Sequence, residues 1–186
     1  MEKKRFTVKD MAMVGVLAAL VFAASSMSIP IPTAVDGTRL HLGNVMCLLS
    51  GFLVGPVPGG LAAGIGSLFF DLTNPLYIKD APFTFLFKFL MAFICGKIAY
   101  AGNAQGLRVR RNLGAGAAGA FTYVALYLSK NFVMNLFFSR LAMQVALMNL
   151  AQKAAVSGTN AVIAVAASVP LATAIRKGLD SRKTNS

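Results

Sequence analysis

The sequence predicts an all-α membrane protein with six transmembrane helices and both termini in the cytoplasm. Of its 186 residues, 56% are hydrophobic and only 13% are charged, about half the charged share of soluble proteins. A soluble domain of this length could not bury so much apolar surface in one core. The hydrophobic residues gather into runs, and most basic residues lie between the runs. This pattern is typical of a chain that crosses the bilayer several times.

Six apolar runs approach the length of about 20 residues that a transmembrane helix needs. The predicted helices cover residues 11–27, 40–54, 57–72, 82–101, 113–138 and 154–175. The N-terminal basic residues and first apolar run also resemble a signal peptide, but the chain continues as a membrane protein, which favours a helix. We expect residues 1–186 to form a single membrane domain.

The second and third predicted helices are short, and only the segment Gly55-Pro56-Val57-Pro58-Gly59-Gly60 separates them. Two prolines and three glycines end a helix and favour a tight turn. We interpret the two runs as a hairpin of short or tilted helices. The alternative is a re-entrant pair.

The orientation follows from the basic residues. Twelve of the 18 fall on the side shared by the termini: Lys3, Lys4, Arg5, Lys9, Lys97, Arg108, Arg110, Arg111, Arg176, Lys177, Arg182 and Lys183. The other six lie in the opposite loops or inside helices: Arg39, Lys79, Lys88, Lys130, Arg140 and Lys153. Basic residues concentrate on the cytoplasmic side, so the termini are predicted to lie inside. The same distribution argues against nucleic-acid binding as the reason for the net charge of +12. Of the outward connections, residues 139–153 look amphipathic and are expected to lie along the membrane surface.

The sequence contains no recognisable catalytic or metal-binding motif. It has one histidine, His41, and two cysteines, Cys47 and Cys95, without metal-ligand spacing. The glycine-rich residues 60–66 lack the lysine of a phosphate-binding loop. The sequence therefore predicts neither an enzyme nor an ATPase, and uphill transport would take its energy from a partner or an ion gradient.

Two charged residues in apolar helices mark a candidate binding site in the outer half of the bundle. Asp71 ends the third predicted helix and Lys88 lies inside the fourth. A charge in the bilayer centre costs about 2.5–3.5 kcal/mol on insertion scales, so it faces protein or water. The alternatives are an Asp71–Lys88 ion pair and, for these residues and Lys130, snorkelling to the interface.

The fifth predicted helix adds a polar stripe, because Tyr123, Tyr127, Asn131 and Asn135 recur every four residues. Lys153, Ser157 and Asn160 make a similar, weaker face at the start of the sixth. The two faces would meet in the outer half if the fifth and sixth helices pack together. Tyrosine rings and amide edges suit a planar polar heterocycle. The alternative is hydrogen bonding between helices.

The first predicted helix carries small residues at every fourth position: Gly15, Ala19 and Ala23. Small residues let helix backbones approach closely in lipid. This face therefore either packs within the bundle or docks onto another membrane protein.

One group of segments carries a family resemblance. These are Leu40-His41-Leu42-Gly43-Asn44, residues 49–56 (LSGFLVGP), residues 59–67 (GGLAAGIGS) with Asp71, and residues 81–88 (APFTFLFK). With them, the chain from residue 4 to residue 177 resembles the substrate-binding S component of energy-coupling factor (ECF) transporters, in the riboflavin-type subgroup.

The resemblance implies a six-helix protein of the prokaryotic plasma membrane that binds a water-soluble vitamin with high affinity near its outer face. It implies a transmembrane T subunit and two cytosolic ATPases as partners in an ABC-type importer. Ala19 and Ala23 match the AxxxA pattern that meets the T subunit. Riboflavin, a pyrimidine precursor of thiamine and vitamin B6 are the candidate ligands, each as cargo and not as a cofactor.

Family contacts do not assign the individual site residues. On physical grounds we expect Asp71, Lys88, Tyr127, Asn131, Asn135 and Asn160 to contact the ligand. The competing hypotheses are a stand-alone, ion-coupled secondary carrier that would use Asp71 or the lysines, and a membrane enzyme or scaffold.

Overall fold

The computed structural model describes residues 7–103 and 106–184, and within these residues the chain forms six α-helices and one β-hairpin. The helices are α1 (Val8–Ser26), α2 (Gly43–Val54), α3 (Pro56–Thr73), α4 (Ala81–Ala99), α5 (Val109–Val133) and α6 (Met143–Thr184). The strands β1 (Ser28–Pro32) and β2 (Gly37–His41) connect α1 to α2. Short 3-10 turns, η1 (Ile78–Asp80) and η2 (Ala101–Asn103), flank α4, and a π-helical segment, η3 (Met134–Phe138), extends α5. The predicted all-α class is confirmed.

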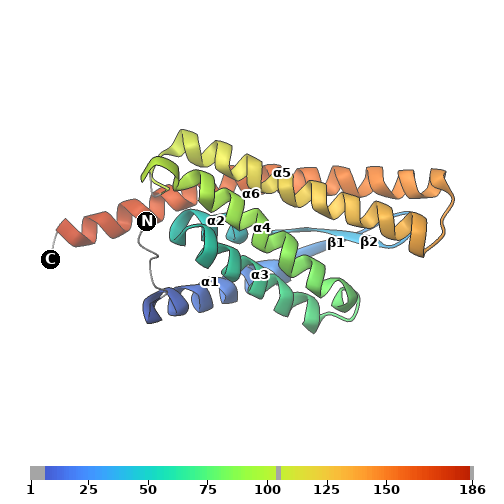
Figure 1. The fold of residues 1–186 in the computed structure, drawn as a ribbon, viewed down its shortest axis with the longest axis horizontal. Coiled ribbons are helices and arrows are strands. Elements are labelled where there is room, and N and C mark those ends of the chain that lie inside the picture. The colour runs from blue at the N-terminus through green and yellow to red at the C-terminus, as the bar shows by residue number, and fades with distance from the viewer. Residues whose placement is uncertain (1–6, 104–105, 185–186) are drawn as a thin grey trace.

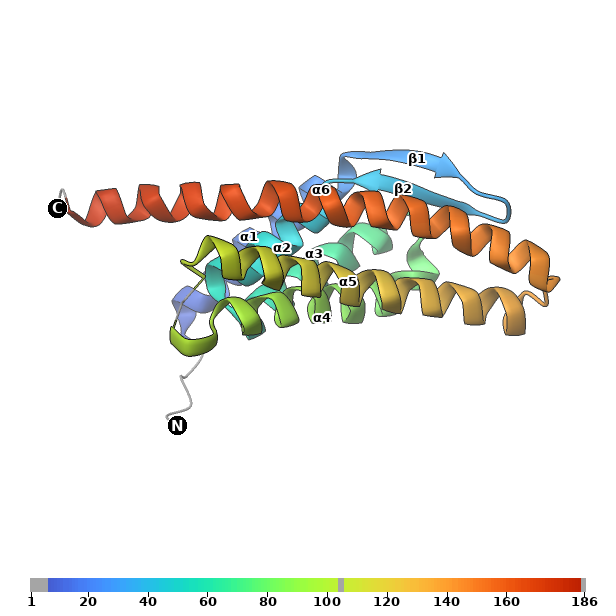
Figure 2. The same cartoon turned by 90° about the horizontal axis from the view of Figure 1, so that it is seen from above.

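The helices lie alongside one another, with the β-hairpin near one end (Figure 1). Helix α1 begins and α6 ends at the opposite end, and α5 and α6 run side by side for most of their length (Figure 2). Three segments of the described chain are long and apolar enough to span a membrane: Val8–Ser26, Ile78–Ala99 and Met143–Gly178. Helix α2 has 12 residues, which is about 18 Å at 1.5 Å per residue and shorter than a typical hydrocarbon core.

The break between α2 and α3 is a single residue, Gly55. Its φ of 88° lies in the left-handed region, and Pro56 starts α3 immediately afterwards. Glycine enters that region without a steric penalty, and proline suits the first position of a helix. The close return also needs glycine at position 59, where a Cβ atom would lie 2.7 Å from the carbonyl oxygen of Ser50. The predicted division into two short helices is thus observed.

The predicted starts of two helices are wrong, and so are the connections that precede them. The second helix starts at Gly43 and not at residue 40, because residues 37–41 pair with residues 28–32 as an antiparallel hairpin. The sixth helix starts at Met143 and not at residue 154. Residues 139–153 therefore do not form a surface segment. Their first four residues are the connection, and the rest are the first turns of α6, with Ala146 and Asn149 fully buried.

The other helix ends differ less. Helix α1 begins at Val8 because Thr7 and Asp10 form a capping box, in which each side chain binds the other's backbone N–H. Helix α5 begins at Val109, four residues earlier than predicted, and with η3 it ends at Phe138, as predicted. Helix α6 continues past residue 175 to Thr184.

The apolar core fills the half of the bundle away from the hairpin. Leu48 and Phe52 of α2 and Met91 and Cys95 of α4 are fully buried there. The helices touch at backbone distance, because a Cβ atom at Gly119 of α5 would lie 2.5 Å from the carbonyl oxygen of Met91. Among the described residues, the buried charged side chains of Asp71, Lys88 and Lys153 lie instead at the hairpin end.

Candidate ligand-binding site

A cavity of about 410 Å³ lies at the hairpin end, within the range of small-molecule sites. We call it the hairpin cavity. It is bounded by the hairpin and by the last turns of α1, α3 and α5. The first turns of α4 and residues 153–160 of α6 complete its walls. Its polar and charged lining residues are Ser25, Asp36, Thr38, Arg39, His41, Ser67, Asp71, Tyr77, Asp80, Thr84, Lys88, Tyr123, Tyr127, Lys130, Asn131, Lys153, Ser157 and Asn160.

Helical periodicity directs these side chains inward. Tyr123, Tyr127 and Asn131 are four residues apart on α5, and Lys153, Ser157 and Asn160 recur at the same turn spacing on α6. A period of 3.6 residues places each set on one helix face. The two faces oppose each other across the cavity because α5 and α6 run antiparallel, side by side (Figure 2).

Lys88 of α4 is a deeply buried cation of the cavity. Only 3% of the Lys88 surface is exposed, which excludes snorkelling of this side chain to the membrane interface. The ammonium donates a hydrogen bond to Asn44 Oδ1 and lies 3.7 Å from the centre of the Tyr123 ring. Among the described residues it has no carboxylate within ion-pair distance. The Asp71–Lys88 pair that the sequence allowed is therefore not formed.

Asp71 is 2% exposed and pairs with Arg39 of β2 instead, at 3.3 Å. The Arg39 guanidinium lies 3.9 Å from the centre of the Phe70 ring and 4.5 Å from that of Tyr77. Such cation–π contacts favour a planar guanidinium. Sequence reasoning missed Arg39 because it placed the residue in an open outward loop. The arginine instead fixes β2 against the end of α3.

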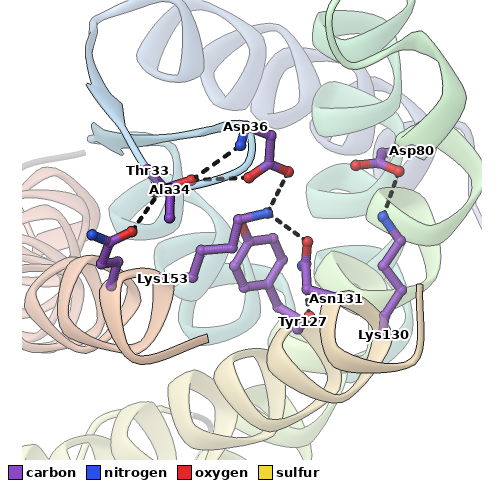
Figure 3. A network of polar contacts seen from close by, with 9 residues as sticks. Thr33, Ala34, Asp36, Asp80, Tyr127, Lys130, Asn131 and Lys153 are labelled. Atoms are coloured by element: carbon purple, nitrogen blue, oxygen red, sulfur yellow. Dashed lines mark hydrogen bonds and ion pairs between the residues drawn. The ribbon is translucent and has the colours of Figure 1, made fainter. Parts of the chain in front are cut away.

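Lys153 joins the hairpin tip to α5 and α6. Its ammonium lies 2.6 Å from Asp36 Oδ2 and 2.7 Å from Asn131 Oδ1, and Figure 3 shows it between these two residues. The residue is 2% exposed. Nearby, the Ala34 N–H donates to Gln152 Oε1 at 2.8 Å. The sequence places Lys153 on the polar face at the start of the sixth helix, and the structure brings this face to the α5 stripe. Lys153 is absent from the predicted ligand contacts, and its partner Asp36 was not predicted.

Lys130, at the cavity rim, forms an ion pair with Asp80 (Figure 3). The Lys130 side chain is largely buried and that of Asp80 is partly exposed. Lys130 therefore meets a protein carboxylate. Its side chain is therefore not an unpaired cation that snorkels to the membrane interface.

Asn160 and His41 connect the hairpin to the helices. Asn160 Oδ1 accepts from the His41 backbone N–H at 3.0 Å, and its Nδ2 donates to the Arg39 carbonyl at 2.8 Å. His41 Nδ1 accepts from the Gly43 N–H. Burial, together with the positive charges of Lys88 and Arg39, holds the pKa of His41 well below its usual value of 6.5. The imidazole is therefore neutral, and its proton is on Nε2.

The cavity brings together five of the six predicted ligand residues: Asp71, Lys88, Tyr127, Asn131 and Asn160. Asn135 is the exception. It lies in η3, one turn beyond Asn131, and does not line the cavity. Its side chain is buried, and its amide nitrogen has no hydrogen-bond partner. The four-residue stripe therefore ends at Asn131 as far as this cavity is concerned.

The small residues of α1 face away from the bundle. Gly15, Ala19 and Ala23 are all exposed, and a Cβ atom at Gly15 would meet nothing within 4 Å. The opposite side of α1 makes the internal contact, because a Cβ atom at Gly66 of α3 would collide with the Ala18 carbonyl. Of the two interpretations, packing within the bundle is therefore wrong for this stripe.

The hairpin cavity can hold a planar ligand by stacking and hydrogen bonding. The Tyr123 and Tyr127 rings lie parallel within 18°, with centres 5.9 Å apart. Four cations and three carboxylates line the cavity, and three ion pairs leave Lys88 as the cation without an anionic partner among the described residues. An electron-rich group of a ligand is the natural complement of this ammonium.

Comparison with known protein families gives a match over most of the chain. A family model described as the ECF-type riboflavin transporter, S component, matches residues 5–177. A search of curated proteins found no match. The matched region includes every residue that lines the hairpin cavity. The chain therefore belongs to the family of S components of ECF-type riboflavin transporters.

Proposed function

We propose that this chain binds a water-soluble vitamin in the hairpin cavity with high affinity, and that riboflavin is the leading candidate. The supporting observation is the combination of the stacked Tyr123–Tyr127 pair with Lys88, a buried cation that has no carboxylate partner within the described part of the chain. A flavin has a wide planar ring system with apolar faces and a pyrimidine edge rich in carbonyl oxygens. The tyrosines and Phe83 and Phe87 offer apolar faces, and Lys88 and Asn131 offer donors to such an edge.

A pyrimidine precursor of thiamine and vitamin B6 present the same chemistry on a smaller ring. Each has a planar heterocycle and polar substituents at its edge. The identity of the bound molecule therefore tests the proposal directly. The protein would be purified from cells in mild detergent, and any retained molecule identified by absorbance and mass spectrometry. A yellow preparation that releases riboflavin supports the flavin assignment. Another vitamin would reject riboflavin but support vitamin binding, and failure to bind any of the three on titration would reject both.

We further propose that the hairpin end faces outward, with six helices across the prokaryotic plasma membrane and both termini in the cytoplasm. Seven of the twelve basic residues assigned inward have described side chains: Lys9, Lys97, Arg108, Arg110, Arg111, Arg176 and Lys177. They belong to the start of α1, the end of α4, the start of α5 and the last part of α6, and Figure 1 shows these helix ends opposite the hairpin. Lys3, Lys4 and Arg5 lie outside the described residues, and the side chains of Arg182 and Lys183 are not described. The positive-inside rule then puts the cavity at the outer face, where an importer first meets its cargo.

The proposal includes a T subunit and two cytosolic ATPases as partners. The exposed stripe of Gly15, Ala19 and Ala23 offers a face that another helix can approach closely. Ala19→Leu should therefore reduce copurification with the T subunit. Ala125→Leu, at an exposed position of α5, is the matched control. Equal copurification of the two variants would contradict the assignment, and vitamin uptake by the reconstituted chain alone would support a secondary carrier instead.

A further inference from the structure

A second cavity of about 470 Å³ lies on the surface between α5 and α6. We call it the α5–α6 groove. All nine residues that line it are apolar, and none of them lines the hairpin cavity. On α5, the lining residues Leu113, Ala117, Phe121 and Val124 follow one helix face. They extend over about 16 Å of helix at 1.5 Å per residue. The groove is thus a long, apolar hollow that is open to the molecular surface.

Exposed side chains form the sides of the groove, and a glycine lies at its base. Phe121 is 75% exposed and Val162 is 70% exposed. Gly158 contributes to the lining, and a Cβ atom there would meet nothing within 4 Å. The missing side chain leaves open space between the two helices. This shape fits an unbranched aliphatic chain better than a second helix, which would need a broad row of small residues on both sides.

Exposed arginines adjoin one end of the groove, the end away from the hairpin. Arg110 lies one turn before Leu113, on the same face of α5, and Arg108 caps this helix. Both are exposed. On α6, the exposed Lys177 lies about three turns beyond the lining residue Ala166, again on the same face. An apolar channel that ends at cations matches the two parts of an anionic lipid.

We propose that the α5–α6 groove is a binding site for an anionic phospholipid. One acyl chain lies along the groove, and the headgroup phosphate meets Arg110 at its basic end. This places the lipid in the leaflet that faces the basic end of the bundle. Basic pockets between membrane helices are known to recognise anionic headgroups in this way. The site is separate from the hairpin cavity, so it stands or falls independently of the vitamin assignment.

Native mass spectrometry of the full chain in detergent tests the proposal. The probes are dioleoyl phosphatidylglycerol and dioleoyl phosphatidylcholine at equal concentration, which share their acyl chains and differ in headgroup charge. Phosphatidylglycerol adducts should outnumber phosphatidylcholine adducts. Arg110→Gln should reduce the phosphatidylglycerol affinity about fivefold, the effect of one cation near a membrane surface, and leave phosphatidylcholine unchanged.

Gly158→Leu should displace both lipids, because the new side chain enters the open space of the groove, where a Cβ atom at this position meets nothing within 4 Å. The matched control for Arg110→Gln is Lys97→Gln, which removes an exposed cation at the basic end of the bundle, on α4. The matched control for Gly158→Leu is Gly114→Leu, because Gly114 has equally open surroundings but lies outside the groove. Neither should alter lipid retention. If Gly158→Leu fails to fold, Ala117→Leu fills the groove from the other wall. Equal retention of the two lipids, or a phosphatidylglycerol preference that survives both Arg110→Gln and filling of the groove, would overturn the proposal.

Discussion

Replacing Lys88 with methionine should weaken ligand binding strongly while changing the stability of the fold little. The ammonium is buried, donates to Asn44 and lies over the Tyr123 ring. Methionine keeps much of the aliphatic volume and removes the charge. The substitution therefore separates what Lys88 does for the ligand from what it does for packing.

The two effects differ in size. A hydrogen bond from a charged donor contributes about 1.5–3 kcal/mol, and each 1.4 kcal/mol is a factor of ten. Loss of a bond from Lys88 to the ligand should therefore raise Kd roughly 10- to 150-fold. For the fold, two contributions oppose each other. Removing a buried charge recovers its desolvation penalty, and replacement of whole buried ion pairs by apolar residues stabilises proteins by about 1–4 kcal/mol, which we take as the scale for one ammonium. Leaving Asn44 Oδ1 without its donor costs about 1–3 kcal/mol, so the net change should stay within about 2 kcal/mol.

The assay is calorimetric titration of the purified protein in detergent with riboflavin, or with the vitamin found in the purified preparation. Thermal unfolding of the same samples reports stability. Lys79→Met is the control, because Lys79 is exposed on η1 and does not line the cavity. Wild-type affinity in a folded Lys88→Met variant would refute the reasoning, because the buried ammonium would then be structural only.

Three further predictions follow from the same contacts. Asp71→Asn leaves the Arg39 guanidinium without its carboxylate, so the free energy of unfolding should fall by up to about 3–5 kcal/mol. Denaturant titrations measure this loss, and an unchanged midpoint would contradict the pairing. Asn131→Ala should weaken vitamin binding in calorimetry and Asn135→Ala should not, because only Asn131 lines the cavity; equal losses would argue against the placement of η3. The pKa of His41 is depressed in the folded chain, so the unfolded chain binds more protons below about pH 6.5 and stability should decline as the pH falls from there toward about 5. His41 is the only histidine in the sequence, so thermal unfolding of a His41→Gln variant should lose this part of the pH dependence, and persistence of the decline would assign it to other groups.

Much of the bundle could be predicted because lipid imposes simple rules. A helix must be long and apolar, and a charge inside it must face protein or water. These rules marked Asp71 and Lys88 as candidate site residues, with snorkelling and a mutual ion pair as the alternatives that the structure excludes. The four-residue spacing on α5 identified Tyr127 and Asn131 for the same reason, since a helix face is a local property of the sequence.

The hairpin and its contacts could not be predicted in this way. Strand pairing joins Ser28 to His41, and such a register depends on contacts across the chain. Arg39 therefore seemed to be a loop cation, although it pairs with a residue on α3. The start of α6 was ambiguous for a different reason. An amphipathic helix on the membrane surface and a helix that buries its polar face in protein have the same periodicity, and only the partners of Lys153 distinguish them.

The arrangement of polar and apolar halves also bears on how a ligand can leave the hairpin cavity. Beyond the cavity, the bundle is closed by Leu48, Phe52, Met91 and Cys95, all fully buried. Helices α2, α3, α4 and α5 touch there at glycines, where no side chain separates the backbones. A path through this half would require helices packed at interior density to separate, and every one of these contacts would be lost at once. The contacts that hold the hairpin are fewer and more polar, with Lys153 and Arg39 as the main links. For the proposed transport of a vitamin, opening the hairpin end therefore costs less free energy than passing the ligand through the core. This difference favours a transport cycle in which the bundle moves as a unit and the hairpin end opens.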